Sequence, residues 1–405
     1  MTIRHSLNQP LSQPLSEPLS ESLSQRLSQQ LSKLESEGLK RQRRTLQAPC
    51  GPAALLDGRP LLSFCSNDYL GLANHPALIE AACQAAKTWG VGSGAAHLVS
   101  GHFAPHQALE AQLARFVGLP RALLFASGYL ANIGIIPSLV GRGDAVFADR
   151  LNHASLIDAV QLSRAESRRY PHLDLRALEN MLAASTAKQK LIVSDAVFSM
   201  DGDVAPLAAL HDLAERFDAW LLIDDAHGFG VLGAQGRGSL SHCALPPSER
   251  IIYMGTLGKA AGVSGAFVAA SEVLIEWLLQ RARSYLFSTG ASPLLAAVLG
   301  TSVALIAEAD AQRAHLRQLI VQLRQGLRDL PWPLLFSESA IQPLIIGANQ
   351  TTLEVAATLF EQGLWVPAIR PPTVAKGRAR LRISLTAAHS TAQVARLIDA
   401  LHGLA

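Results

Sequence analysis

One lysine, Lys259, lies in a glycine-rich segment that could hold a reactive amine. The apolar run Ile251–Met254 before it predicts a buried strand, and the glycines after that run predict a loop. Small neighbours let another molecule approach the amine, and burial would lower its pKa. Lys259 is therefore either a Schiff-base-forming nucleophile or an ordinary surface lysine, and this segment alone favours the surface lysine. A nucleotide-binding phosphate loop is excluded, because Ala260 follows the lysine where that motif needs Ser or Thr.

Two other predicted strands end in side chains suited to acid–base chemistry or ligand binding. The apolar run that starts at Trp220 ends in Asp224, Asp225 and His227, and His153 follows an earlier strand. Ligands of open α/β folds bind at the carboxyl ends of strands, where these side chains would lie. The two carboxylates could instead cap a helix. They could also hold a divalent metal, but a third ligand at suitable spacing is missing, so we expect no metal.

A strand, a small-residue turn and a helix follow one another around Ser127. The strand is predicted at Ala122–Phe125, the turn at Ser127 and Gly128, and the helix from Tyr129 onward. Free backbone N–H groups and the positive end of the helix dipole would meet there, which suits a phosphate. The ordinary interpretation is a serine-capped helix start, and this pattern alone favours it.

The elements that must position these residues alternate between helix and strand after about Leu109, a pattern typical of a parallel α/β sheet. Beyond Ser288 the sequence predicts long helices followed by a few strands, which indicates a smaller α+β domain. Leucine recurs at every fourth position from Leu11 to Leu31; prolines exclude a helix in the first half of this repeat, and a helix is possible after Leu19. We therefore predict an extension at 1–38, an N-terminal segment at 39–65, a large domain at 66–290 and a small domain at 291–405.

Composition excludes several classes of protein. A hydrophobic content of 49%, a charged content of 17% and a net charge of +3 indicate a globular chain without a nucleic-acid footprint. The four cysteines show no CxxC spacing, so we expect a reduced cytoplasmic protein without structural zinc. The apolar window Gly290–Ala309 predicts a buried helix, not a membrane span. The glycines of Gly90–His97 form an incomplete dinucleotide fingerprint, which argues against a nicotinamide oxidoreductase, and His97 and His102 are interpreted as surface residues.

Taken together, these motifs resemble the pyridoxal-phosphate enzymes of fold type I, and within them the α-oxoamine synthases. The resemblance covers the chain after about residue 38 and is carried by the segments 66–72, 197–203, 224–228, 236–238 and 258–259. It implies an α/β fold with a mostly parallel seven-stranded sheet in the large domain, a smaller C-terminal α+β domain, and pyridoxal 5'-phosphate as cofactor. It also implies a homodimer in which the segment Tyr285–Thr289 could reach the neighbouring subunit.

The resemblance assigns roles to individual residues. Lys259 would bind the cofactor covalently and later move the substrate's α-proton, Asp224 would face the pyridine nitrogen, and His227 would bond the phenolic oxygen. His153 would stack on the ring as a further catalytic residue. The phosphate and the rest of the cofactor would be held by Ser127, Gly128, Tyr129, Thr256 and Ser199. Substrate would be bound by Arg41, Asn67, His153, Arg370 and Thr373.

The segments Ala368–Val374 and Arg380–His389 are most similar to the members of this family that join L-alanine to a pimeloyl thioester in biotin synthesis. The acyl donor would be pimeloyl-CoA or a pimeloyl-carrier protein, so an acyl carrier protein stays open as a partner. Two alternatives remain: a sister synthase that uses glycine or serine, and a non-catalytic subunit with the same fold. The presence of Lys259, Asp224, His227 and His153 argues against the non-catalytic subunit.

Overall fold

The computed structural model describes residues 22–246 and 248–405, which form two units divided after Arg43. The first unit contains α1 (Leu23–Ser36), which begins with a reciprocal cap between Ser22 and Gln25 and buries none of its residues. The sequence allowed a helix after Leu19, and α1 is that helix. The earlier part of the leucine repeat lies outside the described residues.

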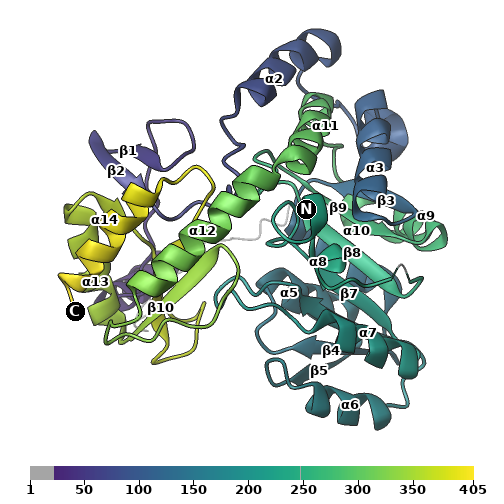
Figure 1. The fold of residues 1–405 in the computed structure, drawn as a ribbon. Helices are drawn as coiled ribbons and strands as arrows, with labels where there is room; N and C mark the ends of the chain where they lie inside the picture. The colour runs from purple at the N-terminus through teal and green to yellow at the C-terminus, as the bar shows by residue number, and fades with distance from the viewer. Residues whose placement is uncertain (1–21, 247) are drawn as a thin grey trace, which may run out of the picture. The chain divides into compact units, whose positions relative to one another are not determined.

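The second unit, Arg44–Ala405, is built on a seven-stranded sheet with the strand order β3-β9-β8-β7-β6-β4-β5. All neighbouring strands run parallel except β9, which is antiparallel to both β3 and β8. The predicted mostly parallel sheet is therefore confirmed (Figure 1). Its strands are β3 (Arg121–Phe125), β4 (Ala145–Asp149), β5 (Glu166–Tyr170), β6 (Lys190–Asp195), β7 (Trp220–Asp224), β8 (Ile251–Thr256) and β9 (Ala266–Ala270).

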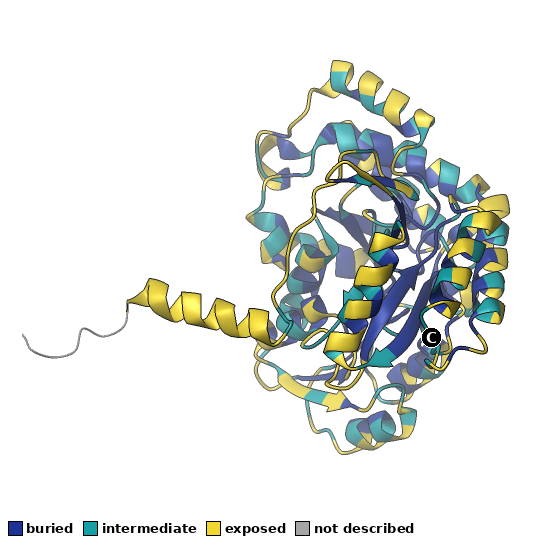
Figure 2. Ribbon diagram, turned by 90° about the vertical axis from the view of Figure 1, so that its left-hand side faces the viewer, coloured by how far each residue is buried: buried dark blue, intermediate teal, exposed yellow. Residues whose placement is uncertain are grey.

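The central strands of this sheet are buried on both faces, whereas β5 at its edge is mostly exposed; Figure 2, in which dark blue marks buried residues, shows strands in the interior of the molecule in that colour. Along β7, Leu221 and Ile223 join one apolar cluster and Leu222 joins the other, because successive side chains point to opposite faces. This explains why the strands read as continuous apolar runs and not as alternating patterns. The helices of this part of the chain include α2 (Pro76–Trp89), α3 (Ala104–Val117), α4 (Gly128–Leu139), α5 (Ala154–Ser163), α6 (Leu175–Ala183), α7 (Leu207–Arg216), α9 (Glu272–Arg281) and α11 (Pro293–Glu308), and α2 packs against α11.

Short helices complete this part of the chain. They are the π-helix His97–Gly101, the 3-10 turn Ala234–Gly236, α8 (Ser239–His242) and α10 (Arg283–Leu286). Within the described residues, none of the helices is by itself both long enough and apolar enough to cross a membrane. In the same part of the chain, only α11 and α12 (Asp310–Gly326) taken together reach that length and apolarity, and they are bent by 66° relative to each other.

The C-terminal part carries a second sheet, in which the central β13 (Ala379–Ser384) is antiparallel to β10 (Ile341–Gly347) and to β12 (Ala368–Ile369). Helices α12, α13 (Asn349–Glu361) and α14 (Thr391–His402) accompany it. A third sheet joins β1 (Ala53–Leu56), β2 (Arg59–Ser63) and β11 (Leu364–Trp365). The predicted boundary at residue 290 falls between α10 and α11 and stays a prediction.

Candidate active site

The loop after β8 presents Lys259 at the carboxyl end of the large sheet. The loop is closed on itself, because Leu257 N donates to Gly265 O and Gly262 N donates to Lys259 O, both at 2.8 Å. Gly262 has a φ of +69°, and a Cβ there would lie 2.5 Å from the backbone N of Ala73. This position therefore needs glycine, and the close packing holds the lysine loop against the polar turn that follows β2.

Lys259 contacts a histidine from the neighbouring strand. Its Nζ lies 2.9 Å from Nε2 of His227, which follows β7 and is buried. Burial lowers the pKa of Lys259 to about 8, although the carboxylates of Asp224 and Asp195 oppose that shift. Burial, reinforced by the charge of Lys259, lowers the pKa of His227 well below its usual range, so this imidazole is neutral. Lys259 has the surroundings of a desolvated amine, and not those of a surface lysine.

Asp224 is held in place by a buried polar network. Its Oδ2 accepts a hydrogen bond from Asn132 Nδ2 at 2.8 Å, and its Oδ1 accepts one from the N–H of Ala226 at 3.1 Å. The same Asn132 amino group donates to Ser155 Oγ at 2.9 Å, and that oxygen lies 2.8 Å from Nδ1 of His153. Helices α4 and α5 thus connect Asp224 and His153, two of the predicted catalytic residues.

The N-terminus of α5 is fixed by a second carboxylate. Asp195, at the end of β6 and paired in register with Asp224, accepts the N–H of His153 on its Oδ2 at 2.7 Å. Burial, followed by the nearby charge of Asp224, raises the pKa of Asp195 well above its usual range. Burial lowers the pKa of His153, while Asp224 acts in the opposite direction. The sequence analysis assigned no role to Asp195.

Asp225 has a different environment from its neighbour. Its Oδ2 accepts from the N–H of Ser239 and from the hydroxyl of Tyr253, both at 2.7 Å, and burial raises its pKa to about 7. A Cβ at Gly238 would lie 2.4 Å from that same oxygen. Asp225 therefore braces the segment around Gly238 and does not join Asp224 in a shared site.

Arg382 of β13 contacts two predicted site residues, Ser199 and Asn67, although the sequence analysis gave it no role. Its Nε donates to Ser199 O at 2.6 Å, and both Nη atoms lie 3.2 Å from Oδ1 of Asn67. Arg380, on the same strand, contacts the carbonyl of Met200. Successive side chains of β13 point to opposite faces, so Arg380 and Arg382 lie on the same face of the strand. This spacing is visible in the sequence, but it does not identify the residues that the two arginines contact.

The predicted phosphate-binding residues lie at the start of α4 and the end of β8. Ser127 caps α4, with its Oγ accepting from Leu130 N at 3.2 Å, so the ordinary serine-cap interpretation holds in this structure. Tyr129 donates its hydroxyl to Asp158 at 2.6 Å. Thr256 donates to Gly265 O at 3.2 Å, across the lysine loop. The first N–H groups of α4 have no acceptor within the helix, which leaves them suited to an anion.

Three further residues were predicted to bind substrate: Arg370, Thr373 and Arg41. Arg370 and Thr373 form a turn after β12, in which Thr373 N donates to Arg370 O at 3.1 Å. Strand β12 pairs with β13, the strand that carries Arg382. Arg41 belongs to the first unit, and its role stays a prediction.

The interpretation of His97 and His102 as surface residues was wrong for His97, which is only 8% exposed. Nδ1 of His97 lies 3.1 Å from Nδ1 of His102, and His106 is close to both. However, His106 accepts from Phe103 N on Nδ1, and its Nε2 lies 2.8 Å from Ala291 O. Both of its nitrogens are thus engaged, which disfavours a three-histidine metal site.

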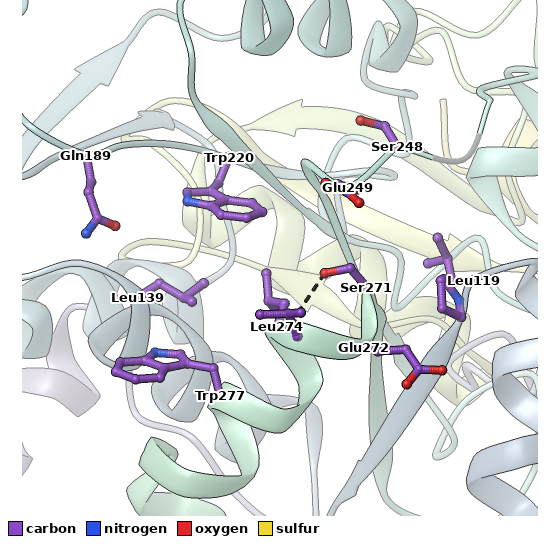
Figure 3. Close-up of a pocket in the computed structure, with 12 residues that line it drawn as sticks. Leu119, Leu139, Gln189, Trp220, Ser248, Glu249, Ser271, Glu272, Leu274 and Trp277 are labelled. Carbon is purple, nitrogen blue, oxygen red and sulfur yellow. Dashed lines mark hydrogen bonds between the residues drawn. The ribbon is translucent and has the colours of Figure 1, made fainter.

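A cavity of about 710 Å³ lies at the opposite end of the large sheet, among residues that precede or begin the parallel strands. Figure 3 shows Trp220 and Trp277 on its wall, with Gln189 and Ser248 nearby. It is lined by neither Lys259 nor Asp224. We therefore place the chemistry at the carboxyl ends of the strands and not in this cavity.

Comparison with known proteins identifies the family of the chain. Residues 59–401 match the family Aminotransferase class I and II. The 8-amino-7-oxononanoate synthase of Herminiimonas arsenicoxydans is 66% identical over 372 residues, covering 91% of this chain and 96% of that protein. The chain belongs to the 8-amino-7-oxononanoate synthase family. This confirms the expected fold type, the expected pyridoxal-phosphate enzyme class and the expected branch of the α-oxoamine synthases.

Solved structures agree with this family assignment. The 8-amino-7-oxononanoate synthase of Francisella tularensis has a TM-score of 0.74 and 30% identity, covering 85% of this chain and 97% of its own. A serine palmitoyltransferase of S. paucimobilis, solved with bound PLP and myriocin, has a TM-score of 0.88 and 29% identity, covering 93% and 96%. Pyridoxal phosphate is therefore the cofactor of this enzyme.

The residues at the carboxyl ends of the strands fit this cofactor. Lys259 supplies an amine with a pKa of about 8, which can attack an aldehyde, and Asp224 supplies a carboxylate held by two donors. The Ser127 turn offers the N–H groups of α4 to a phosphate. The donor set therefore matches an aldehyde, a ring nitrogen and a phosphate.

Proposed function

We propose that this enzyme condenses L-alanine with a pimeloyl thioester to give 8-amino-7-oxononanoate, carbon dioxide and the free thiol, as a step of biotin synthesis. The high identity to enzymes of that name carries the proposal. In this reaction a carbon–carbon bond forms between the α-carbon of alanine and the thioester carbonyl, the carbon–sulfur bond breaks, and the alanine carboxylate leaves as carbon dioxide. When bound, pyridoxal phosphate withdraws electrons from the α-carbon.

The lysine is proposed to hold the cofactor and to move the α-proton of the amino acid. With a pKa of about 8, Lys259 is partly in its neutral form near neutral pH and can take up a proton at Nζ. His227 Nε2, 2.9 Å away, orients that nitrogen. Asp224 is proposed to face the cofactor's ring nitrogen, His153 to stack on the ring face, and His227 to bond its phenolic oxygen, with Ser199 beside the ring near that oxygen.

Substrate carboxylate binding is proposed for Arg370 and Asn67, together with Thr373 and Arg41. Two guanidinium N–H groups of Arg382 point at Asn67 Oδ1, which fixes the orientation of this side-chain amide. Its Nδ2 amino group therefore faces the other way and can donate to a carboxylate. Arg370 can supply a second, charged donor to the same group.

A homodimer is proposed on the basis of exposed apolar side chains near the segment predicted to reach a second subunit. Phe287, Val99 and Val91 are 72%, 80% and 78% exposed, and a bridge between Ala96 and Thr289 brings their two segments together. Large apolar side chains gathered on a surface mark association sites. Sedimentation of the purified chain would test the dimer. A cytoplasmic location and an acyl carrier protein as thioester donor remain predictions.

The experiment that tests the function is a visible absorption titration of the loaded enzyme with L-alanine, glycine and L-serine in turn. A response mainly to L-alanine, with product formed from pimeloyl-CoA, supports the proposal. A response mainly to glycine or serine would move the enzyme to a sister activity. Failure to bind pyridoxal phosphate would favour a non-catalytic subunit.

A further inference from the structure

Tyr69 lies behind His227, in a position to control how this histidine meets Lys259. The tyrosine is 1% exposed and follows the polar turn after β2. Its hydroxyl lies 2.6 Å from Nδ1 of His227 and 3.2 Å from Oδ1 of Asn67. A continuous chain of polar atoms therefore runs from Asn67 through Tyr69 and His227 to the lysine amine.

The hydrogen-bonding groups around Asn67 determine the direction of each hydrogen bond in this series of polar atoms. Arg382 has only donors, so the Asn67 oxygen that faces its two Nη atoms must be an acceptor. The single hydroxyl proton of Tyr69 is donated to that same oxygen. The Tyr69 oxygen must then accept from Nδ1 of His227, which places the imidazole proton on Nδ1.

We propose that Tyr69 is a positioning residue that holds His227 in its Nδ1–H tautomer, so that the Nε2 lone pair faces Lys259. In the opposite tautomer an Nε2–H group would point at the lysine ammonium, and two donors would face one another. The choice matters because His227 is neutral and both tautomers are open to it. The inference rests on the proposed role of Lys259, and it adds that Tyr69, through His227, influences the protonation of the Lys259 amine.

The lysine amine is also surrounded by other charged groups. Asp224, Asp195 and Asp225 favour its protonated form, whereas Arg382 disfavours it. The neutral His227 accepts directly from it at 2.9 Å. Loss of this acceptor would destabilise the ammonium and lower the pKa of Lys259 further, while the other charges stay unchanged.

The test compares full-length wild type, Tyr69→Phe and the control Tyr170→Phe, which removes another buried hydroxyl. Nitrogen-15 NMR of labelled histidines reads the tautomer of His227, assigned by the signals that His227→Gln loses. We expect a protonated Nδ1 in wild type and in the control, and a shift toward the Nε2–H form in Tyr69→Phe.

Two further readouts separate a positioning role from a structural one. In the cofactor-free protein, the pH dependence of Lys259 modification by an amine-reactive reagent, followed by mass spectrometry, should show a lower pKa of Lys259 in Tyr69→Phe. The loaded variant should lose about tenfold in kcat with little change in the KM for L-alanine, whereas the control keeps both. An unchanged tautomer and lysine pKa in Tyr69→Phe would overturn the inference.

Wild type alone provides an independent check if Tyr69→Phe does not fold. An Nε2–H tautomer of His227 in the wild-type protein refutes the inference without any variant. The tautomer is read without substrate, so it also separates the two proposals. An Nδ1–H form in an enzyme that does not use L-alanine would leave this inference standing and remove the proposed function.

Discussion

A substitution at Asn132 tests how the fold stabilises the charged carboxylate of Asp224. Asn132 is fully buried on α4, and its Nδ2 is a donor to both Asp224 Oδ2 and Ser155 Oγ. Asn132→Asp keeps the size and shape of the side chain but replaces this donor with a carboxylate. The change therefore alters the polarity at one atom with little change in packing.

The expected loss can be worked out from the contact. A hydrogen bond to a charged group is worth about 1.5–3 kcal/mol, and about 1.4 kcal/mol corresponds to a factor of ten. At the 2.8 Å separation of the wild-type contact, the charge of one carboxylate disfavours that of the other, so the two would share a proton near neutral pH. We expect kcat/KM for L-alanine to fall by about 10–100-fold in Asn132→Asp. The loss should shrink as pH rises, because the shared proton then leaves and Asp224 regains its charge.

The assay is a pH series of kcat/KM for the loaded enzyme, with pyridoxal-phosphate affinity measured by absorbance. Thr352→Val serves as the matched control, since Thr352 is a fully buried polar residue whose hydroxyl donates to the carbonyl oxygen of Ala348, the N-cap residue of α13. The control should lower thermal stability only. Wild-type kcat/KM in Asn132→Asp, or a loss independent of pH, would refute the reasoning about Asp224.

Three further outcomes are expected. Lys259→Ala should abolish turnover, because it removes the amine proposed to hold the cofactor and to move the α-proton, and appreciable remaining activity would remove its assigned role. Asp224→Asn should still bind cofactor yet lose most of kcat, since a neutral amide cannot keep a ring nitrogen protonated; a wild-type kcat would contradict this. Burial opposes the charge of His172, but hydrogen bonds to Asp149 and Asp203 raise its pKa to about 10. This stabilisation is complete below the unfolded pKa of about 6.5 and is lost as pH rises toward 10. Melting curves should therefore show His172→Gln less stable than wild type by about 1.5–3 kcal/mol at pH 6 but nearly equal above pH 10, and a constant difference would contradict this.

Local sequence signals predicted the elements well. Helix α2 (Pro76–Trp89) carries such signals at both ends, because Pro76 stands at its first position and Gly90 follows its last residue. Strands β7 and β8 were expected from apolar runs that both faces of the sheet bury. The end of such a run also located Asp224 and His227, since a strand end is visible in a single sequence.

The supporting residues could not be predicted, because their partners are far away in the chain. Asn132 contacts a carboxylate 92 positions later, and Tyr69 contacts a histidine 158 positions later. Both looked like ordinary members of a helix and of a turn. Arg382 was seen only as part of a strand in the predicted small domain, although it is 6% exposed and bonds to Ser199 and Asn67. Spacing along the chain carries no signal for such contacts.

The position of Arg382 has a consequence for how the two sheets depend on one another. A buried guanidinium is tolerated only when its donors are paired, and those of Arg382 bond to Ser199 O, Asn67 Oδ1 and Ser384 Oγ. Two of these three partners come from the loop after β6 and the turn after β2, outside the C-terminal sheet. The arginine is thus satisfied only when those segments are in place, and they in turn orient Asn67 and, through Tyr69, His227. The C-terminal sheet therefore contributes to the polar order of the site as well as to the packing of the chain.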